Sequence, residues 1–361
     1  MSDFAKRMTE ILNHGALNLA MAIGYKNQIF DALEDLGGPA TVAEIASAAG
    51  LDSRYLQEWL GVMATGRIVE IFNNPAGEDT YFLPPEHASF LTRRAAANLG
   101  VYTQEIPLLT ACAMEAVNGG FLTGAGIPFS RYPDFQGFMA ELSDAKHQEV
   151  LIDRFLPGVD QGRLLARLKA GIRVCDLGCG HGVAMNLMAA AFPKSTFTGI
   201  DNHGEAIGRA AGAACEMGLA NTVYRILDAA TLHGKKEFSR SFDYICAFDA
   251  IHDQSHPLEA LRGIRFMLAP GGMFSMIDIK ARSRQADNLD HPLGPFLYTV
   301  SLMHCMPIGL NDHGVGLGMM WGREKAEALL RAAGFDHIEI NEMDHDPFNL
   351  HYLCKAPSGE A

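Results

Sequence analysis

Three glycines at alternate positions follow a predicted buried strand near the middle of the chain. The strand covers residues 173–177, and Gly178, Gly180 and Gly182 come directly after it. Glycine allows the backbone to approach a ligand more closely than a Cβ would permit. A helix-forming segment begins at Val183, so the turn lies at the N-terminus of a helix. This pattern is typical of the ligand-binding turn of a doubly wound α/β fold.

The acids around this turn narrow the class of ligand. Asp201 follows the next predicted strand, residues 195–200, and an acid there can accept both hydroxyls of a ribose. A dinucleotide fingerprint needs glycine or alanine three residues after Gly180, where this chain has Val183. Asp176, just before the glycines, would repel a pyrophosphate and attract an ammonium group. An NAD-dependent oxidoreductase is therefore an alternative that the pattern disfavours.

The segment 173–183 resembles motif I of the class I S-adenosylmethionine-dependent methyltransferases. The resemblance implies an α/β fold with a Rossmann-like sheet of seven strands, and S-adenosylmethionine as the cofactor. The residues that it implies for cofactor binding are Asp176, Gly178, Gly180, Asp201, Asp228, Ala229 and Phe248.

A second stretch, from Phe248 to Gly272, resembles the signature of small-molecule O-methyltransferases. His252 and Asp253 follow a predicted strand here, and an amphipathic helix and a Pro-Gly-Gly turn come after them. The resemblance implies that His252 is a catalytic general base with Asp253 beside it. Asp278, near the end of the fifth predicted strand, and the pair Asp312-His313 in the insertion are rivals for orienting the imidazole. A histidine in this place can also cap the following helix, which would make its role structural.

The acceptor class stays open at this point. A neutral hydroxyl needs a base near the point of attack, and an imidazole with a pKa of about 6.5 suits a phenol-like acceptor. A small thiol would use the same base, whereas a thioether would need none. Methyl transfer to sulfur is therefore the alternative within this enzyme class, and His252 is the residue that discriminates the two.

Residues 1–95 have the pattern of a winged helix. A capping-box sequence opens a short helix at Thr41, a second helix is predicted at 53–64, and a β-hairpin at 68–83 follows. Such a domain can bind DNA, but it holds seven basic and twelve acidic residues here, a formal charge of −5. We therefore expect a dimerisation domain and a homodimer, as the resemblance also implies. A ligand-responsive transcription regulator is the non-enzyme alternative.

The rest of the chain is predicted to build the walls of an acceptor pocket. Residues 96–165 are expected to form a helical linker, interrupted at the glycine-rich segment 119–126. Residues 166–361 are expected to form the methyltransferase domain. An insertion at 285–321, rich in Gly, Met, His and Pro, is expected to form loops or short helices with an adaptable apolar surface.

Composition excludes several partners. The net charge of −13 argues against nucleic acid. The N-terminus lacks a signal-peptide pattern and no run of 18 apolar residues occurs, so we expect a cytoplasmic protein with no membrane partner. Seven cysteines, an odd number, do not indicate a disulfide framework. No metal is expected, because a catechol-type magnesium site would need an asparagine directly after Asp278, where Ile279 stands.

Overall fold

The computed structural model describes residues 2–95, 98–132 and 135–357. The chain forms two compact units, Met1–Ala111 and Cys112–Ala361. The boundary between these units falls inside the helix α6 (Glu105–Thr123).

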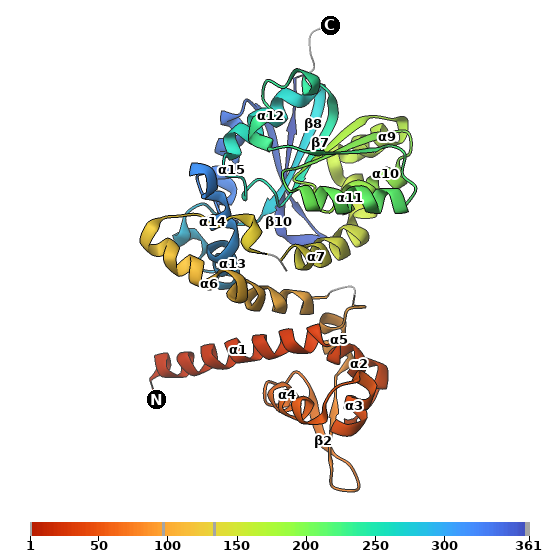
Figure 1. Ribbon diagram of the computed structural model, residues 1–361, viewed down its shortest axis with the longest axis vertical. Coiled ribbons are helices and arrows are strands. Elements are labelled where there is room, and N and C mark those ends of the chain that lie inside the picture. Colours follow the sequence, from red (N-terminus) through yellow and green to blue (C-terminus); the bar gives the residue numbers. More distant parts are fainter. Residues whose placement is uncertain (1, 96–97, 133–134, 358–361) are drawn as a thin grey trace. The chain divides into compact units, whose positions relative to one another are not determined.

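The first unit is mainly helical and carries a small antiparallel sheet with the strand order β1-β3-β2 (Figure 1). Its elements are α1 (Asp3–Lys26), α2 (Ile29–Leu36), β1 (Ala40–Thr41), α3 (Val42–Ala49), α4 (Ser53–Thr65), β2 (Glu70–Asn73), β3 (Asp79–Phe82), α5 (Pro85–Leu91) and a 3₁₀ turn, Gly100–Gln104. The predicted capping box is present, because Thr41 and Glu44 each bond the backbone N–H of the other.

Helices α1 and α4 cross closely in this unit. The indole N–H of Trp59 donates to the carbonyl of Ala20 at 2.7 Å. A Cβ on Gly24 would overlap the Trp59 ring, so glycine is needed where the two helices meet. The side of α4 that bears Leu56, Trp59, Leu60 and Met63 is buried. This helix, which would be the recognition helix of a DNA-binding winged helix, is therefore used largely for packing inside its own unit.

The second unit contains a seven-stranded sheet with the order β6-β5-β4-β7-β8-β10-β9. Strands β6, β5, β4, β7 and β8 are parallel, and β10 runs antiparallel to both of its neighbours, β8 and β9. The strands are β4 (Arg173–Leu177), β5 (Thr196–Asp201), β6 (Thr222–Ile226), β7 (Phe242–Phe248), β8 (Leu268–Ile279), β9 (His337–Met343) and β10 (Asp346–Lys355). The predicted seven-stranded α/β class is confirmed.

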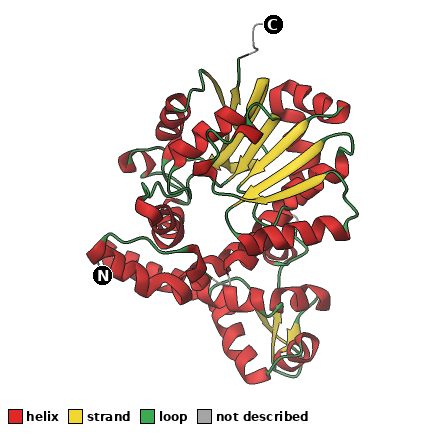
Figure 2. Cartoon of the chain, turned by 45° about the horizontal axis from the view of Figure 1, so that its top comes forward, coloured by secondary structure: helices red, strands yellow, loops and turns green. Residues whose placement is uncertain are grey.

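Helices cover both faces of this sheet (Figure 2). On one face α12 (Pro257–Met267) and α15 (Gly322–Ala332) bury Leu261 and Leu330 against the strands. On the other face α9 (Arg163–Ala170) and α10 (Val183–Ala191) bury Leu168 and Met188. Helix α11 (Gly204–Glu216) lies beside α10. The two apolar layers fix the sheet, so the ends of its strands are held rigidly for a site.

The segments predicted as pocket walls are helical or short and irregular. They contain α6, α7 (Phe135–Val150), α8 (Leu156–Gly158), α13 (Gly294–Val300), α14 (Met306–Gly309) and short 3₁₀ or π turns at Phe129–Arg131, Leu151–Phe155, Val159–Gly162, Gln285–Asn288, Ser301–Cys305 and Asn311–His313. The expected break at residues 119–126 begins later than predicted. Helix α6 continues through Gly119 and Gly120 and ends at Thr123, because each helical glycine costs only about 0.5–1 kcal/mol.

One helical stretch, Gly100–Thr123, has the length and mean hydropathy of a membrane span. A single helix of this kind is weak evidence for insertion into a membrane, because the core helices of soluble proteins and signal sequences have the same length and hydropathy.

Candidate active site

In the glycine turn after β4, packing requires glycine at two positions, whereas the third glycine faces open space. All three have positive φ, at 73°, 51° and 73° for Gly178, Gly180 and Gly182. A Cβ on Gly178 would lie 2.5 Å from the Cβ of Ala250, and one on Gly182 would lie 2.7 Å from the Cβ of Ala210. A Cβ on Gly180 would meet no protein atom within 4 Å. The open side of Gly180 is therefore where a ligand can reach this backbone.

Asp201, at the end of β5, is bonded to this turn. One carboxylate oxygen accepts the backbone N–H of Gly180 at 3.0 Å, and the other accepts that of His203 at 2.8 Å. Each oxygen keeps a further lone pair, so the carboxylate can still accept from the two hydroxyls of a ribose. Asp228, after β6, is exposed and caps the next turn by accepting from the N–H of Ala230 at 2.9 Å.

Asp176, near the end of β4 just before the turn, is buried, with a residue exposure of 2%. Burial, together with the neighbouring charge of Asp201, raises the pKa of its carboxyl to about 7. The thiol of Cys246, 3.7 Å away, is its hydrogen-bond donor. An acid held this way gains from a cation placed beside it, since the cation favours the ionised form.

The seven residues predicted for cofactor binding lie at one edge of the sheet. They belong to the ends of the adjacent parallel strands β4, β5, β6 and β7 or to the turns directly after them. The N–H of Gly178 donates to the carbonyl of Ile200 at 2.8 Å, which holds the first two strand ends together. This edge is where open α/β sheets bind ligands.

His252 lies at the same edge, after β7, and its imidazole is held by a buried carboxylate. Its Nδ1 lies 2.8 Å from Oδ1 of Asp278, which is fully buried near the end of β8. The same oxygen accepts the N–H of Ile279 at 2.9 Å and the indole N–H of Trp321 at 3.0 Å. An ionised carboxylate only accepts, so Nδ1 carries a hydrogen and Nε2 of the neutral ring keeps its lone pair.

The Nε2 side of His252 faces a second carboxylate and a thiol. Oδ1 of Asp253 is 3.4 Å from Nε2, and these two atoms and Sγ of Cys305 lie within 4.8 Å of one another. Burial opposes the imidazolium, but Asp278 and Asp253 outweigh it and hold the pKa of His252 well above its usual value. Burial raises the pKa of the Cys305 thiol to about 12. This trio could also hold a metal ion, and an ion there would occupy the lone pair of Nε2.

Of the candidates for orienting the imidazole, Asp278 is the one that bonds Nδ1. Trp321 and Cys305 were not predicted as site residues, because both come from the region of the insertion, whose folding no local pattern predicts. The sequence signal that existed was Asp278 itself, a charged residue inside an otherwise apolar strand.

The aromatic segment after α6 packs onto the insertion. The hydroxyl of Tyr132 donates to the carbonyl of Met303 at 2.7 Å, and the N–H of Ile127 donates to that of Pro307 at 3.0 Å. The ring of Phe129 lies 5.4 Å from that of His203 and 6.1 Å from that of His304. Phe129 thus links the turn after β5 to the insertion that carries Cys305.

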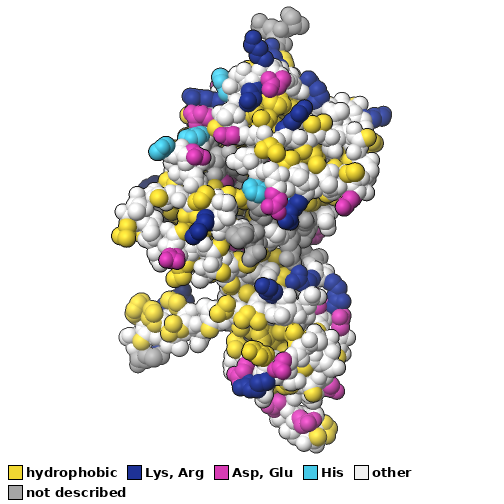
Figure 3. All heavy atoms as spheres, viewed as in Figure 1, with side chains coloured by type: hydrophobic (Ala, Val, Ile, Leu, Met, Phe, Trp, Pro, Cys, Tyr) yellow, Lys and Arg dark blue, Asp and Glu magenta, His cyan; other side chains and the backbone are white. Residues whose placement is uncertain are grey.

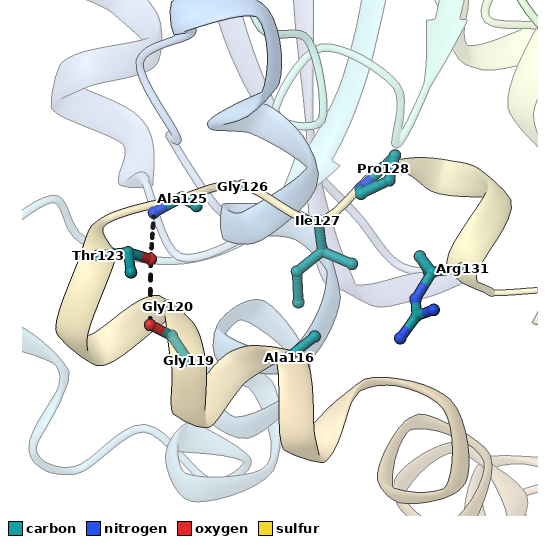
Figure 4. A pocket seen from close by; sticks show the side chains of 9 residues that line it. All are labelled: Ala116, Gly119, Gly120, Thr123, Ala125, Gly126, Ile127, Pro128 and Arg131. Carbon is teal, nitrogen blue, oxygen red and sulfur yellow. Dashed lines mark hydrogen bonds between the residues drawn. The ribbon is translucent and has the colours of Figure 1, made fainter.

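A separate hollow of about 270 Å³ lies between α6 and the segment that follows it (Figure 4). It is lined by Ala116, Gly119, Gly120, Thr123, Ala125, Gly126, Ile127, Pro128 and Arg131. None of the predicted cofactor or catalytic residues lines this hollow, so we assign the candidate active site to the edge of the sheet, where the chemical groups converge.

Comparison with solved structures reproduces the fold over the whole chain. Human N-acetylserotonin methyltransferase, solved in complex with S-adenosylmethionine, is 15% identical with a TM-score of 0.69, and the match covers 99% of each chain. A candidate O-methyltransferase of Nostoc punctiforme is 16% identical with a TM-score of 0.72, covering 98% of this chain and 100% of that one. An O-methyltransferase family protein of Burkholderia thailandensis is 14% identical with a TM-score of 0.68 over 100% of both chains. At such identities the likeness establishes the fold.

Family models identify the two parts of the chain. Residues 15–93 match the Rv2258c-like winged helix-turn-helix domain, and residues 168–296 match a methyltransferase domain. No curated protein gives a significant match. The second match includes the glycine turn, Asp201 and His252, so the motifs that suggested this class lie within it. The chain is therefore an S-adenosylmethionine-dependent methyltransferase with an N-terminal winged helix-turn-helix domain.

Proposed function

We propose that this enzyme methylates the hydroxyl group of a small, phenol-like acceptor with His252 as the general base. The observation that carries this proposal is the fixed orientation of the buried imidazole. Asp278 holds Nδ1 at 2.8 Å, so Nε2 is the nitrogen left for the acceptor. Solved structures with this fold include the mitomycin 7-O-methyltransferase MmcR, at 16% identity.

The residues around the glycine turn fit the cofactor. Gly180 offers backbone with no side chain in the way, and Asp201 offers two acceptor oxygens. Asp176 offers a buried carboxyl that a cationic methionine moiety would favour in its ionised form. We propose that Asp228, Ala229 and Phe248 complete this site around the adenosine. When bound, the cofactor supplies an electrophilic methyl group on a sulfonium, so the protein itself need not activate the leaving group.

The protein must then orient the acceptor and take its proton. In the proposed step, Nε2 of neutral His252 accepts the hydroxyl proton, and the acceptor oxygen would take the methyl group that a bound cofactor would supply, with the cofactor's sulfur as the leaving group. The imidazolium that forms is stabilised by Asp278. Asp253, on the Nε2 side, is in place to accept a hydrogen bond from the acceptor.

A thiol acceptor is the second candidate, because the same base would ionise it. A thioether would require no proton transfer, so the ion pair of His252 with Asp278 would have no catalytic purpose there. The buried pair therefore favours an acceptor that loses a proton.

Replacement of the imidazole tests the base. His252→Ala should lower turnover of a phenol by roughly 10²–10⁴ and leave cofactor affinity nearly unchanged, because the proton acceptor is lost and the glycine turn is not. The measurements are steady-state kinetics with phenols, thiols and thioethers in the presence of EDTA, and calorimetry with the cofactor. Joint loss of binding and activity would indicate a structural histidine. A rate retained from pH 6 to 9 would favour a thioether, and loss of wild-type activity in EDTA would favour a metal at the His252 trio.

We also propose that the enzyme is a homodimer built on the N-terminal domain. One side of α1 exposes the apolar side chains Met8, Leu12, Leu19 and Ile23, with exposures of 39% to 69%. Their spacing places them in one stripe along the helix, and Gly15 lies within it. Hydrophobic side chains gather on this helix in the space-filling view (Figure 3). A stripe of this kind marks a surface for another chain.

A further inference from the structure

Three polar side chains that no motif singled out meet beside the proposed catalytic histidine. Asp249 follows β7, and Asp346 and Asn349 belong to β10. The amide Nδ2 of Asn349 donates to Oδ2 of Asp346 at 3.0 Å and to Oδ2 of Asp249 at 3.4 Å. Asp346 and Asn349 are 4% and 2% exposed. The ammonium of Lys146 lies 2.6 Å from Oδ2 of Asp346 and pairs with that acid. We call these three residues, Asp249, Asp346 and Asn349, the acidic cluster.

Two acceptor atoms of the acidic cluster receive no hydrogen bond. Oδ1 of Asp249 and Oδ1 of Asn349 are buried, and no residue in the described part of the chain donates to either. A buried acceptor without a donor costs about 1–3 kcal/mol. Both atoms are oxygens that can only accept, so a ligand that satisfies them must bring hydrogen-bond donors.

The charge of the acidic cluster favours a cationic donor. The ammonium of Lys146 is paired with Asp346, and Asp249 adds a negative charge of its own to the acidic cluster when it is ionised. Burial raises the pKa of Asp249 to about 6, so the carboxyl is largely ionised at neutral pH.

The position of the acidic cluster assigns it to the acceptor rather than to the cofactor. Asp249 precedes His252 by three residues, and after that of Lys146 the charges that act most strongly on it are those of Asp278 and His252. Asp176, the acid expected at the cofactor's ammonium, lies near the end of β4 and interacts instead with Asp201. Asp249 therefore interacts with the proposed catalytic histidine, whereas Asp176 interacts with an acid of the proposed cofactor site.

We infer that the acidic cluster is a subsite for an ammonium group of the methyl acceptor, with Asp249 and Asn349 as its ligands. This inference rests on the proposed function, because the hydroxyl group of the acceptor is taken from that proposal. The acceptor class is then a phenol that carries a primary amine on a short chain, held at one end by the acidic cluster and at the other by His252.

Matched pairs of phenols test the subsite. The amines are 4-hydroxybenzylamine, tyramine and 4-(3-aminopropyl)phenol, and each is paired with the alkylphenol that has a methyl group in place of the ammonium. Calorimetry on the full chain with S-adenosylhomocysteine bound measures affinity without turnover. At least one amine should bind tenfold or more tightly than its neutral partner, since a hydrogen bond to a charged group is among the stronger ones.

Asp249→Asn is the variant to compare. The φ of this residue is 49°, a conformation that asparagine tolerates well, so the fold should be kept. Asparagine loses the negative charge, and the preference for the amine should fall to within threefold while affinity for the neutral phenol and for the cofactor is unchanged. The control is Asp243→Asn, at the start of the same strand and paired with Arg173, which should keep the preference.

Each of the following results decides whether the acidic cluster binds an ammonium group of the acceptor. Equal binding of amine and alkylphenol by the wild-type protein, or a preference that survives Asp249→Asn, overturns the subsite. A loss of cofactor affinity in Asp249→Asn would assign the acidic cluster to the cofactor and would equally overturn it. If the enzyme methylates none of the six phenols, the result counts against the proposed hydroxyl chemistry. The calorimetry would still decide separately whether an ammonium group binds here.

Discussion

His252 stands between two carboxylates, and its protonation state therefore governs how the enzyme should respond to pH. Only the neutral imidazole can take a proton from the acceptor. Asp278 and Asp253 hold the pKa of His252 well above 6.5, so the imidazolium persists to higher pH than for a free histidine. The catalytic rate should consequently rise with pH through a value above 6.5.

Removal of the carboxylate charge should shift this profile. Asp278→Asn should lower the pKa of His252 and move the rising part of the rate profile to lower pH, while the maximal rate falls roughly tenfold or more because the imidazole loses its orienting partner. Asp253→Asn should shift the profile in the same direction by less, since its charge has the smaller effect. The measurement is kcat/KM from pH 5 to 10. A rising limb that stays in place in both variants would contradict the general-base assignment.

The glycine turn allows effects on cofactor binding and on folding stability to be tested separately. Gly180→Ala should weaken cofactor binding tenfold or more, because the new Cβ enters the open space, and it should lower stability by about 1–2 kcal/mol for its positive φ. Gly178→Ala should lower the unfolding temperature further, because its Cβ meets Ala250. Calorimetry and thermal unfolding measure both.

The matched control for the turn is Gly208→Ala in α11. No atom lies within 4 Å of its Cβ position and its φ is helical, so this variant should gain about 0.5–1 kcal/mol and keep cofactor affinity. Wild-type affinity in Gly180→Ala would sink the assignment of the turn to the cofactor.

The sequence predicted those elements whose signal is local. The strand, glycine turn and helix around Gly180, and the capping box at Thr41, are each encoded within about ten neighbouring residues. The acidic cluster was not predictable in this way. Asp249 and Asn349 are one hundred positions apart and meet only because β10 enters the sheet beside β8. The hydrogen bond from Trp321 to Asp278 has the same origin, a long-range contact that leaves no periodic pattern.

For the whole molecule, the apolar stripe on α1 predicts the state of assembly. The wild-type protein should elute as a dimer at micromolar concentration, measured by size exclusion with light scattering. Leu12→Glu with Leu19→Glu should give a monomer, because two charges would be placed in the apolar stripe. An equivalent pair in a polar turn of the second unit, Lys235→Glu with Lys236→Glu, where Lys235 is half-buried and Lys236 exposed, should remain a dimer. A monomeric wild type, or a stripe variant that remains dimeric, would contradict the proposal.

The position of β10 has a consequence for how the enzyme is made. This strand follows all other described strands in the chain, yet in the sheet it lies between β8 and β9. During synthesis, a nascent chain that has not yet released β10 holds β8 with one unpaired edge and leaves β9 without its partner. Asp346 and Asn349 are also missing from the acidic cluster at that stage. The glycine turn can therefore form early on the ribosome, whereas the proposed acceptor subsite is among the last parts to form. Until β10 is released, the open edge of β8 is the main site at risk of aggregation.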